Sequence, residues 1–231
     1  MDYAEISRIL GLNEREDRRA RDVLDSLVRG FDERVLSQII RNKKVLVFGC
    51  GPSLKEDFVR LKPRFKEFVL VSVDGSIRLF MEEDVLPHLH VTDLDGDVPA
   101  TIEANRRGVV TVVHAHGDNI DKLREVVPKL SGKVFGTTQV EPTKKVLNFG
   151  GFTDGDRAVY LAEHYKPSVI YLAGMDYGKK IGEYSGEYTL KKKREKLAIG
   201  KKLLEELAGK TKTPIVNLTS RGVRLAGIPK K

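Results

Sequence analysis

The sequence predicts an α/β protein with a Rossmann-like, mainly parallel sheet and helical crossovers, preceded by an N-terminal helical extension. From Lys43 onward, segments rich in β-branched residues alternate with segments of helical periodicity, which is the rhythm of βαβ units. Seven of the strand-like segments end in small, acidic or polar residues. Ligands of an open parallel sheet bind outside the carboxyl ends of its strands, so these polar ends predict one composite site.

Residues 1–42 are predicted to be helical because their apolar residues, Phe31 among them, recur at three- and four-residue spacings around a break at 11–13. Such an extension can cover a face of the core or form a homodimer contact, and the sequence does not choose between these. We expect a helical extension over 1–42 and an α/β domain with a basic C-terminal segment over 43–231.

Strands and helices alternate through the α/β domain. The predicted strands are 44–49, 68–73, 89–92, 109–115, 134–138, 169–174 and 214–218. The predicted helices are 53–62, 76–84, 99–107, 119–127, 153–165 and 187–209. The glycine- and charge-rich stretch 174–186 is the best candidate for a mobile loop.

Composition excludes several classes of protein. The single cysteine, Cys50, rules out an internal disulfide framework. The chain also lacks a CxxC motif, so its cysteine content gives no reason to expect a zinc or thioredoxin-like site. No apolar run approaches the roughly 20 residues of a membrane span. The first ten residues lack a basic stretch followed by an apolar one, so we expect a cytoplasmic protein without a membrane partner.

The net charge of +8 is local to the C-terminal end. Residues 190–231 hold thirteen Lys or Arg against three Glu, whereas residues 1–189 hold twenty-eight against thirty acidic residues. The basic run 191–196 lies in a predicted helix, where it forms either a solvated face or a cationic flap over a polyphosphate. No RNA-binding aromatic motif accompanies the run, and we expect no nucleic-acid partner.

The first strand leads into a glycine loop. Gly49, Gly51, Pro52 and Ser53 precede a helix, and free backbone N–H groups there would form an anion nest for phosphate. Leu54 stands where GxGxxG has its third glycine. Binders of NAD, S-adenosylmethionine and ATP all use such a loop, and a plain tight turn is the alternative.

Carboxylates follow the second and third strands. Asp74, beside Gly75, lies about twenty residues beyond the glycine loop, where a dinucleotide-binding fold has its ribose-binding acid. Strand alternation puts Asp93 and Asp95 on one side, and two carboxylates beside a phosphate nest suit Mg²⁺. A solvated acidic turn is the alternative interpretation.

The fourth strand ends in a histidine cluster. His114 and His116 permit a zinc or iron site, since an HxH motif at a strand end can ligate such metals. The simpler interpretation is one buried histidine, with Asp118 or Asn119 capping the next helix. A third option is that Asp118 and Asn119 pair with the edge of a heterocyclic substrate.

A Gly-Gly loop opens the helix predicted over 153–165. Thr153 or Asp154 suits its N-cap, which would explain these residues fully. The loop also fits a site for nucleotide phosphates or their metal, with Arg157 as the charge partner.

Taken together, VDG at 73–75, TDLDG at 92–96 and TDGDRAVYLAEHY at 153–165 resemble, in order, the ADGG, GDFDS and TD-plus-helix motifs of thiamine pyrophosphokinases. The segments FGCGPSL, VTDLDGD, HAHGDN, GGFTDGDRA and AGMDYG are more similar to the archaeal, MptE-like 6-hydroxymethyl-7,8-dihydropterin pyrophosphokinases. This resemblance covers about 43–225. Related domains also occur in bacterial flagellin-modification proteins, so the family alone does not fix the substrate.

The resemblance implies a thiamine pyrophosphokinase-like catalytic fold and Mg²⁺-dependent transfer of pyrophosphate from ATP to the pterin, releasing AMP, in folate or methanopterin biosynthesis. Asp93 and Asp95 would be catalytic, and with Asp74 they would hold Mg²⁺. The residues expected to contact ATP are Gly49, Gly51, Pro52, Ser53, Asp74, Gly75, Thr153, Asp154 and Arg157. Those considered for the pterin are His116, Asp118, Asn119 and Asp176.

Three other functions stay open on the sequence. One is a thiamine pyrophosphokinase. Another is a Rossmann-type enzyme that uses NAD(P) or S-adenosylmethionine, although it leaves the acidic residues 93–97 without a use. The third is a non-catalytic nucleotide-binding module on the same fold.

Overall fold

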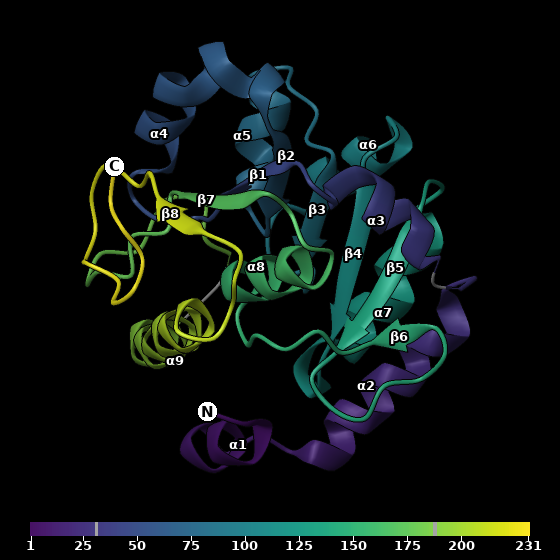
Figure 1. The fold of residues 1–231 in the computed structure, drawn as a ribbon. Coiled ribbons are helices and arrows are strands. Elements are labelled where there is room, and N and C mark those ends of the chain that lie inside the picture. Colours follow the sequence, from purple (N-terminus) through teal and green to yellow (C-terminus); the bar gives the residue numbers. More distant parts are fainter. Residues whose placement is uncertain (31, 187–188) are drawn as a thin grey trace.

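An all-parallel sheet runs through the centre of the computed structural model, which describes residues 1–30, 32–186 and 189–231 (Figure 1). Among these residues it has eight strands: β1 (Lys44–Phe48), β2 (Val69–Val73), β3 (Leu89–Thr92), β4 (Val110–Ala115), β5 (Val134–Thr138), β6 (Val146–Leu147), β7 (Val169–Ala173) and β8 (Ile215–Asn217). The α/β prediction is confirmed, and all seven predicted strands are present. The sequence missed β6, because two residues are too few for a periodic pattern.

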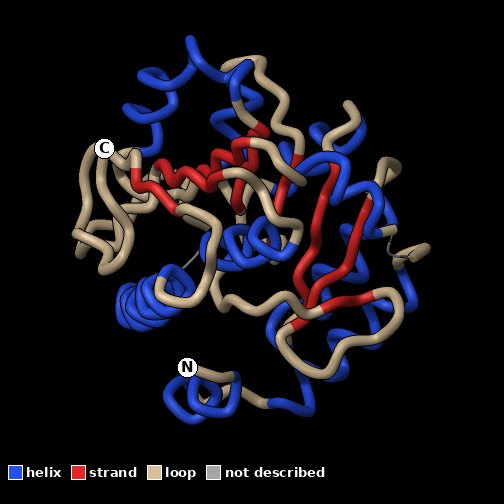
Figure 2. The backbone as a smooth tube through the Cα atoms, viewed as in Figure 1, coloured by secondary structure: helices blue, strands red, loops and turns tan. Residues whose placement is uncertain are grey.

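Helices flank the sheet on both sides (Figure 2). They are α1 (Tyr3–Leu10), α2 (Glu14–Leu27), α3 (Glu33–Ile40), α4 (Leu54–Leu61), α5 (Ser76–Glu82), α6 (Val98–Arg106), α7 (Ile120–Val126), α8 (Asp154–His164) and α9 (Leu190–Ala208). Short 3₁₀ turns cover Lys62–Glu67, Gly117–Asn119 and Val127–Lys129. Each helix predicted in the α/β domain is present within a few residues. Phe31 and the first two residues of the helix predicted over 187–209 lie outside the described residues.

The strand order β6-β5-β4-β3-β2-β1-β7-β8 places a switch point beside β1. From β1 the chain moves outward in one direction to β6, and then returns to pair β7 with the other side of β1. At such a point, loops on the two sides lead away to opposite faces of the sheet, which leaves a crevice at the carboxyl ends of the strands. The topology therefore positions a site beyond the ends of β1 and β7.

Both faces of the sheet are buried, and successive residues of β1 serve opposite faces. Val45 and Val47 belong to a core cluster that includes side chains of α3, α8 and α9. Leu46 and Phe48 belong to a second cluster, with side chains of α4 and α5. Burial on two sides explains why the strand segments read as continuous apolar runs.

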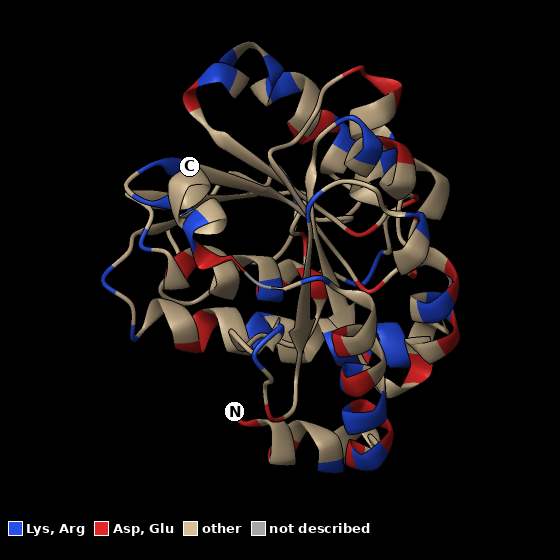
Figure 3. Ribbon diagram, turned by 90° about the vertical axis from the view of Figure 1, so that its right-hand side faces the viewer, with Lys and Arg blue, Asp and Glu red and all other residues tan. Residues whose placement is uncertain are grey.

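The N-terminal helices pack on the α/β core. Leu36 of α3 joins the cluster that contains α8, and Leu24 of α2 joins the side chains of α7 and β4. Ile6 of α1 packs against Ile199 and Leu203 of α9. The helices thus cover core surface, the first of the two roles considered from the sequence. Figure 3 shows acidic and basic residues along these helices.

None of the helices in the described ranges combines the length and the apolar composition that a membrane span requires.

We predict that Phe58→Ala lowers the free energy of unfolding by about 3–5 kcal/mol, the usual cost of truncating a buried phenylalanine. Phe58 is fully buried and its ring lies 5.7 Å from that of Phe48 and 4.9 Å from that of Phe80. Urea denaturation measures the change. The control is Val59→Ala on the same helix, which should cost under about 0.5 kcal/mol because Val59 is 60% exposed. Equal losses in the two variants would contradict the assigned packing.

Candidate active site

A cavity of about 330 Å³ lies beyond the carboxyl ends of the central strands. The loops after β1, β2, β3 and β7 contribute to its wall, together with the start of α8 and the first turns of α9. This is the crevice that the switch point predicts. The predicted site residues that line the cavity are Gly49, Gly51, Pro52, Asp74, Asp93, Asp95, Thr153, Asp154 and Asp176.

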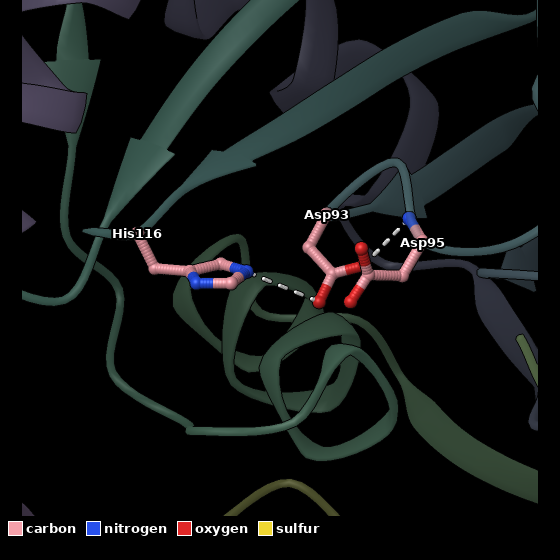
Figure 4. A group of neighbouring side chains, drawn as sticks. All are labelled: Asp93, Asp95 and His116. Carbon is pink, nitrogen blue, oxygen red and sulfur yellow. Dashed lines mark hydrogen bonds and ion pairs between the residues drawn. The ribbon is translucent and has the colours of Figure 1, made fainter. Parts of the chain in front are cut away.

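Asp93 is held at the centre of this site (Figure 4). Its backbone N–H donates to Asp154 Oδ2 at 3.0 Å, and its carbonyl oxygen accepts from Asn119 Nδ2 at 2.8 Å. Its carboxylate accepts from the backbone N–H of Asp95 at 3.0 Å and lies 3.5 Å from His116 Nε2. The backbone of Asp93 is therefore tied to α8 and to Asn119, and its carboxylate is held by its own loop and by the residue that follows β4.

Two groups of donor atoms share Asp93. Asp74, Asp93 and Asp154 offer atoms within 4.8 Å of one another, and so do Asp93, Asp95 and His116. Asp74 Oδ1 is buried without a hydrogen-bond partner in the described part of the chain. Clustered carboxylates with an unsatisfied oxygen suit Mg²⁺, which prefers oxygen ligands. Asp154 therefore belongs to a group of residues that could bind a metal ion. From the sequence we expected Asp154 to contact ATP and did not name it as a metal ligand.

The carboxylates of the site repel one another. Burial, together with the charge of Asp93, raises the pKa of Asp74 to about 7. Burial, together with the charges of Asp93 and Asp74, raises the pKa of Asp154 well above its ordinary value. Burial alone would also raise the pKa of Asp93, but the interaction with His116 outweighs it and holds that pKa below the usual range. A bound cation would relieve this repulsion.

The glycine loop after β1 differs from the predicted phosphate nest. The N–H of Gly51 donates to the carbonyl oxygen of Gly174 at 2.7 Å. The N–H and the hydroxyl of Ser53 both donate to Asp176 Oδ2, at 3.2 and 2.7 Å. Ser53 is fully buried, so it is not exposed to a ligand in this conformation. Asp176, which we considered for pterin recognition, lines the cavity and is also the acceptor at this loop.

The cluster after β4 supports the loop of Asp93. His116 lies beside Asp93, whereas the buried His114 is 3.3 Å from Thr137 Oγ1 and belongs to neither donor group among the described residues. The two histidines therefore do not converge on one metal. Asn119 is buried and joins Asp93 to β4 by donating to their carbonyl oxygens. Asp118 is exposed and does not line the cavity.

Residues at the start of α8 cap the helix and also line the cavity. Thr153 is the N-cap of α8 and forms a capping box with Asp156, so its hydroxyl is engaged inside the protein. Arg157 is buried and donates to the carbonyl oxygen of Phe152 at 2.7 Å. It does not line the cavity, although we had expected it to pair with a nucleotide. Its charge lies near Asp154 and Asp156 and offsets those buried carboxylates.

Lysines line the same cavity as the carboxylates. Lys192, Lys193 and Lys196 come from α9, and Lys180 from the segment before it. The sequence left open whether this basic run faces solvent or covers a ligand. The structure turns part of it toward the cavity. In the sequence, the basic residues of α9 that line the cavity already recur at the spacing of one helix face. The sequence alone did not show which part of the protein that face would meet.

The segment 181–186 crosses the three loops that carry the site. A Cβ added to Gly182 would lie 2.0 Å from the carbonyl oxygen of Cys50, and one added to Gly186 would lie 2.2 Å from that of Asp95. A Cβ on Gly75 would meet the carbonyl oxygen of Tyr184 at 1.8 Å. Segment 181–186, which is part of the stretch predicted as a mobile loop, therefore packs directly on the glycine loop, the Asp74 loop and the Asp95 loop. Gly75 leaves room for this segment because it has no side chain.

We predict that Gly182→Ala destabilises the protein by about 1–3 kcal/mol, the typical cost of overpacking, because its Cβ would collide with the backbone of the glycine loop. Thermal unfolding measures the loss. Gly178→Ala is the matched control, since an added Cβ there meets nothing within 4 Å. If the two variants unfold alike, segment 181–186 is not packed on that loop.

We predict that Asp74→Asn stabilises the metal-free protein at pH 8 but not at pH 4. Between the ordinary value of 3.8 and about 7, the folded protein retains a proton that the unfolded chain releases, so the free energy of unfolding falls as pH rises. Above pH 7 the wild type contains a charge that asparagine lacks. We expect the free energy of unfolding of Asp74→Asn to exceed that of the wild type by about 1–2 kcal/mol at pH 8, after allowing for the partial exposure of the Asp74 side chain.

Urea denaturation in EDTA at the two pH values tests this prediction. Asp121→Asn is the control, because the Asp121 side chain is fully exposed and should show no pH-dependent gain. A gain for Asp74→Asn of the same size at pH 4 and pH 8 would contradict the assigned burial of charge.

Comparison with known proteins gives a consistent picture. A family model described as 6-hydroxymethylpterin diphosphokinase MptE-like matches residues 22–182. A 6-hydroxymethyl-7,8-dihydropterin pyrophosphokinase from Methanocaldococcus jannaschii is 39% identical over 86% of this chain and 85% of its own length. Proteins with the same description from Methanothermobacter thermautotrophicus and Pyrococcus furiosus are 42% and 37% identical, over 79% and 94% of this chain and 79% and 96% of their own lengths.

A solved structure supports the fold. The MAf glycosyltransferase from Magnetospirillum magneticum AMB-1 superposes with a TM-score of 0.58 over 96% of this chain, at 15% sequence identity. This chain spans 39% of that protein, and the likeness concerns the fold alone. Together, the match over residues 22–182 and the archaeal relatives show that this chain belongs to the MptE-like 6-hydroxymethylpterin diphosphokinase family.

Proposed function

We propose that the protein transfers pyrophosphate from ATP to 6-hydroxymethyl-7,8-dihydropterin, giving the pterin diphosphate and AMP in methanopterin or folate biosynthesis. Three archaeal relatives carry the name of this activity. The observation in the structure that supports it best is the pair of donor groups sharing Asp93, whose carboxylates line one cavity together with the lysines of α9. A triphosphate with its cation requires both kinds of charge.

The reaction moves one diphosphoryl group. The hydroxymethyl oxygen forms a bond to the β-phosphorus of ATP, the bond from that phosphorus to the oxygen bridging the α-phosphate breaks, and AMP leaves with the electron pair. Catalysis of such transfers consists mainly of positioning and charge neutralisation. The fixed carboxylates and the nearby lysines are suited to both tasks.

Asp93 would hold Mg²⁺ together with Asp74 and Asp154, or with Asp95 and His116. Bound there, the cation would neutralise developing charge on the phosphates. The acceptor hydroxyl must release a proton. Asp95 lines the cavity whereas Asp118 does not, so we assign any role in taking that proton to Asp95.

The other hypotheses fit the residues less well. A Rossmann-type NAD(P) or S-adenosylmethionine enzyme would use the glycine loop, whose donors are engaged by Gly174 and Asp176, and it has no need for the shared carboxylate groups. A thiamine pyrophosphokinase would use the same carboxylates, but the relatives are named for a pterin. A non-catalytic module would bind nucleotide without turnover. A cytoplasmic location and a homodimer stay predictions from the sequence.

The test is to incubate the purified protein with ATP, Mg²⁺ and the dihydropterin, with thiamine in a parallel reaction, and to separate the products by chromatography. AMP together with a pterin diphosphate is the expected result. ADP would indicate a monophosphoryl kinase, and AMP formed only with thiamine would change the acceptor. Bound ATP without turnover would favour the non-catalytic module.

We predict that Asp93→Asn and Asp95→Asn each lower kcat by at least about 10²-fold, because each removes a charge placed to act on the phosphates. Asp121→Asn, a fully exposed carboxylate, should retain activity. Circular dichroism separates loss of folding from loss of chemistry. Wild-type turnover in both site variants would contradict the assignment of the carboxylates, and undiminished turnover in EDTA would contradict the use of Mg²⁺.

A further inference from the structure

A carboxylate of the protein occupies the place where a Rossmann-type loop would hold phosphate. Asp176 Oδ2 accepts from both the N–H and the hydroxyl of Ser53, at the start of α4. A Cβ added to Gly51 would lie 2.0 Å from the same oxygen, so the glycine makes room for Asp176 rather than for a ligand. The positive end of α4 is thus already neutralised, and a phosphate there would meet a negative charge.

The first turns of α9 supply positive charge to the wall of the cavity. Lys193 and Lys196 both line it and are three residues apart, which puts them on one face of the helix. Both lysines line the same cavity as Asp74 and Asp93. A ligand in this cavity would therefore contact the lysines and the carboxylates together.

A close helix contact fixes this part of α9. A Cβ on Gly200 would lie 2.7 Å from Asp156 Oδ1 and 3.1 Å from Thr153 Oγ1, so α9 touches the capping box at the start of α8. Lys196 lies about one turn before Gly200 and Lys193 about two turns before it. The contact at Gly200 thus holds both lysines close to the cavity wall formed by Thr153 and Asp154.

We propose that Lys193 and Lys196 bind the β- and γ-phosphates of ATP, in place of the glycine loop after β1. This deepens the proposed function and rests on it, because it assigns the groups that hold the diphosphate to be transferred. The transferred group lies between the lysines and the cation-binding carboxylates, while Asp176 keeps phosphate away from α4.

The experiment measures the affinities of Lys193→Gln and Lys196→Gln for ATP and for AMP, with Mg²⁺, by isothermal titration calorimetry. Each variant should lose about tenfold to a hundredfold in affinity for ATP, the usual range for one charge-assisted contact, and under about twofold for AMP, which lacks the β- and γ-phosphates. Lys191→Gln is the matched control, since it makes the same change on the same helix and does not line the cavity.

Two outcomes would overturn the proposal. Equal losses for ATP and AMP would mean that the lysines shape the cavity instead of contacting the terminal phosphates. Wild-type ATP affinity in both lysine variants, together with tighter ATP binding by Asp176→Asn, would place the phosphates at the glycine loop. Failure of the pyrophosphokinase function is a separate result, seen as the absence of AMP formation by the wild-type enzyme that still binds ATP.

Discussion

The site depends on one constraint, the repulsion among its carboxylates. The fold brings these carboxylates together at the ends of β2 and β3 and at the start of α8. Asp74, Asp93 and Asp154 come from three separate segments, and their carboxylate oxygens lie within 4.8 Å of one another, close enough to coordinate one cation. Their raised pKa values, apart from that of Asp93, express the cost of holding them together. The surrounding structure offsets part of this cost with positive side chains: Lys122 at 2.7 Å from Asp95, and the buried Arg157, whose charge lies near Asp154.

The sheet topology explains why these residues converge. Because every strand is parallel, all the carboxyl ends open on one edge, and the reversal of strand order beside β1 brings the loops after β1 and β7 together. Glycines allow close approach to the segment after β7: Gly51, after β1, meets Asp176, and Gly75, after β2, meets Tyr184. The same packing that closes the cavity thus removes the free donors that make a glycine loop a phosphate site in other folds.

Most of the fold was readable from the sequence because each of the seven predicted strands is a largely buried apolar run with a clear end. Asp93 and Asp95 were readable for the same reason: a carboxylate directly after such a run has nowhere to lie except at the open edge. Ser53 and Arg157 were not, because their partners, Asp176 and Phe152, are set by tertiary contacts. A buried arginine that supports a loop and an exposed arginine that binds a phosphate look alike in sequence, and only their surroundings distinguish them.

Fold alone does not decide the chemistry. A glycosyltransferase shares this architecture at 15% identity, so the parallel sheet and its crevice are compatible with more than one transfer reaction. What narrows the reaction here is the balance of charge across the cavity. A neutral acceptor by itself would leave the carboxylates and the α9 lysines to pair only with each other, whereas a triphosphate with its cation matches both sides at once. The arrangement therefore suits ATP, and the same wall also carries the uncharged side chains of Phe152, Met175 and Tyr177.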